Sequence, residues 1–281
     1  MTTYQQAIDA LNARYADLSP RAKLTSGGRV PHFMDNVLPG VRQEDFETEL
    51  KQGDGHELED HFLAVHSSSA LCVNAFAPFK TCPQLLALAG ETGIPPFIFE
   101  RKCPVGLNGR SNHHPPNLDL LAEDPSRIIA VESKCTEYLK PPKADFAAAY
   151  KQDIRDARRE GPWFREMLEC MEGPRTFRHL NVAQLIKHAF GIANIDRLEG
   201  FGPRAAKLVY LYWEPTNATD IDECLAHRSE VDKFSRRIAG GFPGFVAMTY
   251  RELWDRWDKL TEPDWLRAHV SNLRARYEVS I

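Results

Sequence analysis

The sequence predicts an α/β (α+β) fold in which helices flank a mixed central β-sheet. Short apolar runs rich in Val, Ile, Leu and Tyr alternate with longer segments in which apolar residues recur every three or four positions. Because the two kinds of segment alternate over most of the chain, a mixed sheet with helices on its faces is expected. The predicted strands span residues 96–102, 118–121, 128–131, 206–213 and 245–250.

The predicted helices are bounded by cap and stop residues. Ser67 precedes an apolar run and can cap its helix, and Gly240 follows the last turn of another helix. Trp254 and Trp257 share one face of a helix near the end of the chain, which indicates core packing more than base stacking. The predicted helices span residues 4–16, 44–51, 67–76, 144–160, 182–189, 221–238 and 251–260.

Composition narrows the class of protein. The 281 residues are 43% hydrophobic and 26% charged, which is typical of a globular protein. The net charge of -4 argues against a general nucleic-acid-coating protein, although acidic metal ligands would also lower it. Neither a long apolar run nor a secretory signal is visible, so we expect a cytoplasmic protein. The six cysteines form no CxxC pair, which argues against structural zinc and favours free thiols.

One predicted hairpin carries three charged residues on apolar strands. If the hairpin is centred on Pro125 and Ser126, Asp119 lies directly opposite Glu132. The Cβ atoms of such cross-strand neighbours are about 4.5–5.5 Å apart. Because side chains alternate along a strand, Glu132 and Lys134 share one face. This register brings the three charges together, whereas a longer turn would shift it.

Two carboxylates beside an ammonium suit a divalent-metal hydrolase that acts on phosphodiesters. Carboxylates this close repel each other unless a cation lies between them, and Mg²⁺ prefers hard oxygen ligands. A bound metal lowers the pKa of water and neutralises phosphate charge, and a lysine can stabilise the transition state. The alternative is an ordinary surface ion pair between Lys134 and one of the two carboxylates.

This arrangement resembles the PD-(D/E)XK nuclease superfamily, which has the restriction-endonuclease-like fold. The motif corresponds here to Pro116 and Asp119, followed by Glu132 and Lys134. The superfamily places Pro next to Asp, whereas two residues separate them in this chain. The order of one helix, three strands, a helix and a strand also matches the core of the superfamily. More loosely, residues 53–213 look like a bacterial family of restriction endonucleases within that superfamily.

The resemblance implies a metal-dependent nuclease. Asp119 and Glu132 would hold Mg²⁺, for which Mn²⁺ could substitute, and Lys134 would position or polarise the attacking water. Because no clear linker is visible, we expect a single nuclease-like domain over residues 53–281. A helical extension over residues 1–52 would precede it, with the whole chain forming a single domain.

Other polar residues are candidates for the same site. The superfamily often places a metal-linked Glu on its first core helix, and Glu57 is the candidate catalytic residue and metal ligand here. Glu100 lies in the strand beside the hairpin and could be a further carboxylate. Gln184 and Lys187 lie one turn apart on a helix from which related nucleases place a Gln or Lys at the active site. We assign Gln184 to catalysis and Lys187 to nucleic-acid binding. Each of these residues has an alternative without a functional role. Glu57 would then be a solvated charge after a turn, Glu100 an edge-strand charge, and Gln184 and Lys187 part of a polar helix face.

Basic residues and histidines lie in the loop before the hairpin. Arg110 could bind the DNA backbone, since a guanidinium suits phosphate. His113 and His114 could touch phosphate or metal, but a surface pair without a role is favoured. The arginines of the helix predicted over residues 144–160 could also meet phosphate, or form a solvated charged face.

The favoured hypothesis is a metal-dependent DNA endonuclease in restriction or defence, with DNA as its partner and homodimer formation left open. The alternative is a catalytically idle scaffold that binds nucleic acid or a partner protein. A third hypothesis is an unrelated hydrolase of small phosphate esters. The sequence contains neither a GxxxxGK[ST] loop nor a GxSxG elbow, which argues against P-loop NTPases and α/β-hydrolase esterases.

Overall fold

The fold is built on a mixed five-stranded sheet with the strand order β1-β2-β3-β4-β5. The computed structural model describes residues 1–21, 23–25, 27–53, 57–103, 116–141, 146, 161–173, 176–198, 204–261 and 263–281. Neighbouring strands are antiparallel from β1 to β3 and parallel from β3 to β5. The strands are β1 (Phe97–Lys102), β2 (Asn117–Glu123), β3 (Arg127–Lys134), β4 (Ala205–Tyr212) and β5 (Gly244–Thr249). The predicted fold class is confirmed.

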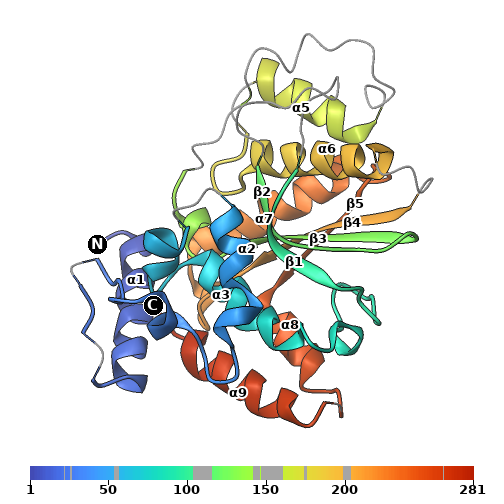
Figure 1. Cartoon of the computed structure of the whole chain (residues 1–281). Helices are drawn as coiled ribbons and strands as arrows, with labels where there is room; N and C mark the ends of the chain where they lie inside the picture. The colour runs from blue at the N-terminus through green and yellow to red at the C-terminus, as the bar shows by residue number, and fades with distance from the viewer. Residues whose placement is uncertain are drawn as a thin grey trace.

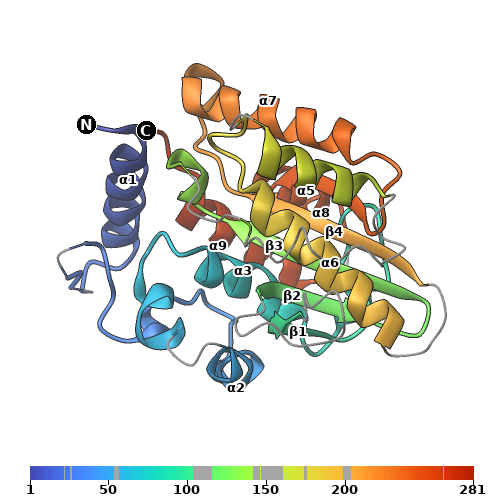
Figure 2. The same ribbon diagram turned by 90° about the horizontal axis from the view of Figure 1, so that it is seen from above.

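Helices cover both faces of the sheet (Figure 1 and Figure 2). One face carries α5 (Pro162–Glu172), α6 (Val182–Leu198) and α7 (Asp222–Arg237). The other face carries α3 (Ser68–Phe76), α8 (Tyr250–Trp257) and α9 (Trp265–Tyr277), with α1 (Thr3–Leu18) and α2 (Glu47–Gln52) beside them. In the described part of the chain, no helix combines the length and the apolar character needed to cross a membrane.

The β2–β3 hairpin has the register that the sequence predicts. Leu120 pairs with Val131, and the pairing continues to the end of β2. The backbone N–H of Asp124 donates to the carbonyl oxygen of Arg127 over 3.0 Å, which closes a two-residue turn. The register therefore depends on turn chemistry, as expected for a short hairpin.

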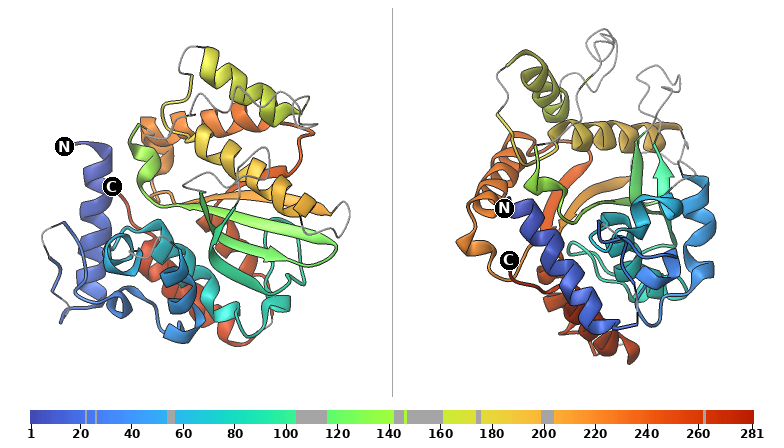
Figure 3. Two further views of the ribbon diagram at one scale, coloured as in Figure 1. Left: turned by 45° about the horizontal axis from the view of Figure 1, so that its top comes forward. Right: turned by 90° about the vertical axis from the view of Figure 1, so that its left-hand side faces the viewer.

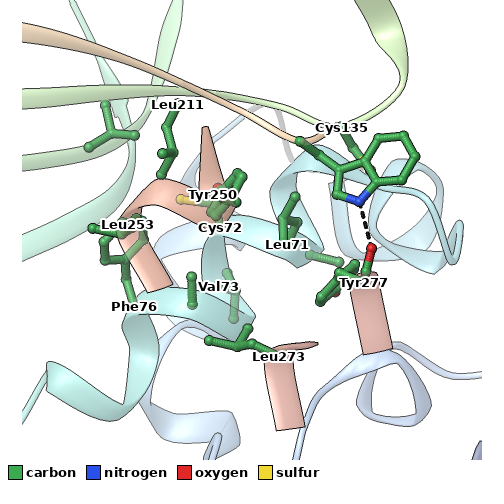
Figure 4. Packing of buried hydrophobic residues seen from close by; sticks show 14 of the residues in the cluster. Leu71, Cys72, Val73, Phe76, Cys135, Leu211, Tyr250, Leu253, Leu273 and Tyr277 are labelled. Atoms are coloured by element: carbon green, nitrogen blue, oxygen red, sulfur yellow. Dashed lines mark hydrogen bonds between the residues drawn. The ribbon is translucent and has the colours of Figure 1, made fainter. Parts of the chain in front are cut away.

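An apolar cluster fills the layer that contains α3, α8 and α9. Leu71 and Phe76 of α3 lie with Leu253 of α8 and Leu273 of α9 below Leu211 of β4 (Figure 4). All five side chains are fully buried. A second apolar cluster occupies the opposite face of the sheet, under α5, α6 and α7.

The central strand β3 contributes to both clusters. Ile129 and Val131 belong to the cluster under α3, whereas Ala130 belongs to the cluster under α6. Because side chains alternate along a strand, Glu132 continues the α6 face and Ser133 the α3 face. The apolar residues 128–131 are thus followed by the polar residues 132–134 at the carboxyl end of β3, which helices cover on both faces.

The last helix joins the N-terminal residues to the sheet. Just after β4, the indole of Trp213 donates to the carbonyl oxygen of Tyr277 over 2.7 Å (Figure 4). The guanidinium carbon of Arg276 lies 4.9 Å from the ring centroid of Tyr15 on α1. α1 therefore packs beside α9 (Figure 3). The division of the chain into an extension and a domain stays a prediction.

α6 is longer than predicted and passes close to the end of β1. The sequence predicts a helix that ends at residue 189, whereas α6 continues to Leu198. A Cβ atom added at Gly191 would overlap the Cβ of Cys103, which follows β1. Glycine therefore occurs within this helix because the helix and the strand end approach closely.

Most other predicted elements are confirmed with shifted ends. α2 begins at residue 47 instead of 44, because residues 43–45 form a separate 3₁₀ turn. α5 and α9 are helices that the sequence did not predict. The helix predicted over residues 144–160 lies largely outside the described residues. All six cysteines are free thiols, as expected, and four of them are buried.

Gly191→Ala should destabilise the protein, although alanine favours helices by about 1 kcal/mol over glycine. The added methyl group would meet Cys103, and overpacking of this kind costs about 1–3 kcal/mol. The free energy of unfolding, measured by urea denaturation, should fall by a similar amount.

Gly244→Ala is the matched control. A Cβ atom at this position of β5 would make ordinary contact with the carbonyl oxygen of Ala206 at 3.6 Å. The change should therefore stay within about 0.5 kcal/mol of wild type. An unchanged or increased stability of Gly191→Ala would show that close packing of α6 is not required.

Candidate active site

Three acidic residues stand in line across the first three strands. Extended one residue beyond the pair of Leu120 and Val131, the β2–β3 register places Asp119 opposite Glu132. The β1–β2 register places Glu100 opposite the same Asp119. These adjacent positions bring together charges that lie far apart in the sequence.

β2 is irregular at Asp119. Leu118 and Leu121 both belong to the cluster under α6 although they are three residues apart, so strand alternation breaks between them. Oδ2 of Asp119 accepts a hydrogen bond from the backbone N–H of Ser133 over 2.7 Å. Because strand N–H groups lie in the plane of the sheet, this bond holds the carboxylate against β3.

The neighbouring charges make ionisation of Asp119 unfavourable. Burial and the carboxylate of Glu132 raise the pKa of Asp119 well above its usual range, and Glu100 raises it further. Lys134 and the N–H of Ser133 lower this pKa, but less. Closely spaced carboxylates behave in this way unless a cation neutralises them.

Glu132 has the opposite electrostatic environment, although its side chain is only 1% exposed. Oε1 contacts the ammonium of Lys134, and Oε2 lies 2.8 Å from Nε2 of His188 on α6. Burial raises the pKa of Glu132, but Lys134 and His188 outweigh it, and the pKa lies below its usual range. Glu132 is therefore the carboxylate that stays ionised.

Lys134 is surrounded by negative charge. Burial lowers the pKa of Lys134, but the carboxylates of Glu132, Glu137 and Asp119 raise it above its usual range. Its side chain is 13% exposed, so the ammonium lies nearer solvent than the carboxylate that it contacts. A charged donor at such a position can bind a phosphate oxygen or a water molecule.

α3 and α8 support the strand from the other face. Oγ of Ser133 donates to the carbonyl oxygen of Ser68 over 3.0 Å, and the hydroxyls of Ser133 and Tyr250 are 2.7 Å apart. Burial and the charges of Asp119, Glu100 and Glu132 together raise the pKa of the Cys72 thiol on α3. α3 therefore lies directly beneath the acidic row.

Glu100 adopts an unusual backbone conformation. Its φ angle is +52°, in the left-handed region that a glutamate seldom occupies. The residue is partly exposed and its charge acts on Asp119. Strained residues of this kind cluster at functional sites, so the geometry favours a role for Glu100 over a simple edge-strand charge.

The structure places the other candidate residues as follows. Gln184 lies in the first turn of α6, where its Oε1 accepts from Nδ2 of Asn181 over 3.0 Å. The ammonium of Lys187 lies 5.6 Å from the ring centroid of Phe146. Glu57 begins a short 3₁₀ turn after α2 and is partly exposed. Arg110, His113 and His114 lie outside the described residues.

Sequence reasoning selected the helix that contacts Glu132, but it did not single out His188 as the contacting residue. This residue lies one turn beyond Gln184, on the same side of α6, and it is fully buried against Glu132. The i,i+4 spacing from Gln184 was the available signal. Which turn of the helix reaches β3 depends on how closely α6 packs, and this cannot be read from the spacing alone.

The oxygen donors fit a hard divalent cation. Within the described ranges, no group of three or more His, Cys, Asp or Glu side chains could enclose a metal ion. Mg²⁺ does not need such a cage, since one or two carboxylates usually bind it together with water and substrate phosphate. Asp119 and Glu132 supply two carboxylates, and Oε2 of Glu132 is buried without a well-formed hydrogen bond to a described residue.

Comparison with known proteins identifies a family. The family model described as "Restriction Endonuclease associating with ARP" matches residues 18–278, which is most of the chain. Neither a curated protein nor a solved structure matches the chain. The matched range includes the whole acidic row, together with Lys134 and His188.

Asp119→Asn should stabilise the metal-free protein at neutral and alkaline pH. The folded-state pKa of Asp119 is raised, so its contribution to stability is present below the unfolded pKa of about 3.9. That contribution is lost as the pH rises through the folded pKa. Asparagine cannot ionise and can still accept from Ser133. By urea denaturation in EDTA, the gain should be about 1 kcal/mol or more at pH 8 and smaller at pH 5.

Glu132→Gln should have the opposite effect. The folded-state pKa of Glu132 is lowered, so its contribution is present above the unfolded pKa of about 4.3 and lost as the pH falls through the folded value. The substitution leaves Lys134 and His188 without their carboxylate, which should cost about 3–5 kcal/mol at pH 7. If both substitutions changed stability in the same direction, the two carboxylates would not differ as described.

Proposed function

Since the chain belongs to the family of restriction endonucleases associating with ARP, we propose that it is a divalent-metal-dependent nuclease that cleaves DNA in restriction or defence. We also propose that the chain is a member of the PD-(D/E)XK superfamily, and the mixed sheet and the motif of Asp119, Glu132 and Lys134 support this. The observation that carries the proposal is the meeting of Asp119 on β2 with Glu132 and Lys134 on β3. Such groups can hold a divalent metal and stabilise the charge that develops during phosphodiester hydrolysis.

Asp119 and Glu132 would hold Mg²⁺, or Mn²⁺ in its place. When bound, the metal would lower the pKa of a water molecule and neutralise charge on the phosphate. Asp119 uses Oδ2 for the bond to Ser133, which leaves Oδ1 outside that bond. Repulsion between the two carboxylates favours a cation between them.

Lys134 would act directly on the substrate. Its ammonium carries three donors, of which one contact is made with Oε1 of Glu132. The remaining donors would hold the attacking water or a phosphate oxygen. Since three carboxylates keep the group protonated, it would stabilise negative charge that develops on the phosphate.

A catalytically idle scaffold is the second candidate, and one observation favours it. Both oxygens of Glu132 already contact groups of the chain itself, Lys134 on one side and His188 on the other. An ion cluster that satisfies itself can persist without metal. Such a protein would bind nucleic acid or a partner protein through the same surface.

The proposed partners are DNA and, from the family description, ARP. Metal dependence is part of the proposal, with Mg²⁺ as the expected ion. Homodimer formation and a cytoplasmic location stay predictions from the sequence.

Lys134→Ala should lower cleavage by about 100- to 1,000-fold, as expected for removal of one donor that acts on transition-state charge. DNA binding should be nearly unchanged, because the interaction strengthens only in the transition state.

Asp119→Ala should lose both metal binding and cleavage. The measurements are nicking of supercoiled plasmid with Mg²⁺ or Mn²⁺, a gel shift and a metal titration, on modified and unmodified DNA.

Lys207→Ala is the control for removal of a strand lysine. Lys207 lies on β4 and pairs with Glu91, so its loss should leave cleavage unchanged. Cleavage that survives in both Lys134→Ala and Asp119→Ala would place the active site elsewhere. Wild-type protein that binds DNA but never cleaves it would support the idle scaffold.

A further inference from the structure

His188 occupies a buried position directly behind the acidic row. It lies on α6, its side chain has no exposed surface, and Nε2 is 2.8 Å from Oε2 of Glu132. Nδ1 and Nε2 of His188 and Oε2 of Glu132 make no well-formed hydrogen bond to any residue in the described part of the chain. Burying three polar atoms without well-formed hydrogen bonds costs folding free energy, so their presence at this position calls for an explanation.

We propose that His188 is a positioning residue that fixes the carboxylate of Glu132 for metal binding. This inference rests on the proposed function. The imidazole lies against Oε2 on the α6 side, and Oε1 contacts Lys134 on the other side. The charge of Glu132 also acts on Asp119. A glutamate has three rotatable side-chain bonds, so a rigid partner on one oxygen restricts where the other can lie.

The geometry favours positioning over direct ligation. Among the described residues, no three side chains of the types His, Cys, Asp or Glu lie close enough together to hold a metal ion. His188 is more deeply buried than Lys134, so it lies behind the carboxylate as seen from solvent. Residues that orient ligating carboxylates from behind typically change metal affinity or activity by about 10- to 100-fold when replaced.

A core histidine without such a role would have a different partner. His269 is also buried, at 4% exposure, but it lies on α9 and its Nε2 contacts the carbonyl oxygen of Ala75 over 3.1 Å. It belongs to the helical layer on the opposite face of the sheet. Its replacement therefore controls for the loss of a buried imidazole.

Mn²⁺ titration of the purified full chain, followed by the electron paramagnetic resonance of free Mn²⁺, tests the proposal. His188→Leu should weaken Mn²⁺ binding by about 10- to 100-fold, and His269→Leu should bind like wild type. His188→Gln should recover most of the loss, because its terminal amide can occupy the position of Nε2. His188→Asn should not recover it, because its shorter side chain reaches only the position of Nδ1. If the leucine variant does not fold, the Gln and Asn pair carries the test.

The outcomes separate this inference from the proposed function. Wild-type protein that binds Mn²⁺, together with His188→Leu and His188→Asn of equal affinity, would overturn the positioning role alone. Equal losses in His188→Leu and His269→Leu would also overturn it, since any buried imidazole would then matter. Wild-type protein that binds no Mn²⁺ would overturn the proposed function and, with it, the role of His188.

Discussion

The burial of one carboxylate constrains the arrangement around it. Glu132 lies on the central strand, 1% exposed, where an unpaired charge would be strongly destabilising. Lys134 can reach it from two residues along the same strand, but the second contact must come from another element. α6 therefore has to pack with His188 at this point, and Gly191 permits that approach beside Cys103. The position of α6 against β3 and the arrangement of the candidate site both depend on the contact between His188 and Glu132.

The two carboxylates of the site differ because their partners differ. Glu132 contacts an ammonium and an imidazole, whereas Asp119 accepts a hydrogen bond from a backbone N–H and has two further carboxylates acting on it. Their pKa values are thus displaced in opposite directions, a pattern that often marks functional pairs. The fold therefore stabilises the charged form of Glu132 and disfavours the charged form of Asp119.

The sequence predicted the strands and the hairpin register well because both depend on local chemistry. Apolar runs define the strands, and the short turn fixes which residues face each other. The contact of His188 could not be predicted, because it depends on the depth at which α6 packs. The expected role of Gln184 rested on the family resemblance, whereas in the structure its side chain bonds to Asn181 at the start of the helix. The backbone strain at Glu100 likewise leaves no trace in the amino-acid pattern.

The turn that sets the site lies at the other end of the hairpin. Oδ1 of Asp124 accepts from the backbone N–H groups of Ser126 and Arg127 over 2.7 and 3.0 Å, and the guanidinium of Arg127 donates to the carbonyl oxygen of Thr92 over 3.1 Å. Asp124 lies five residues after Asp119, which is roughly 17 Å along a strand. A one-residue change in the turn would still move Asp119 out of register with Glu132 and reverse the faces of one strand. The 13-residue spacing between Asp119 and Glu132 therefore has meaning only together with the turn. The hairpin brings the two carboxylates face to face because its length matches a two-residue turn.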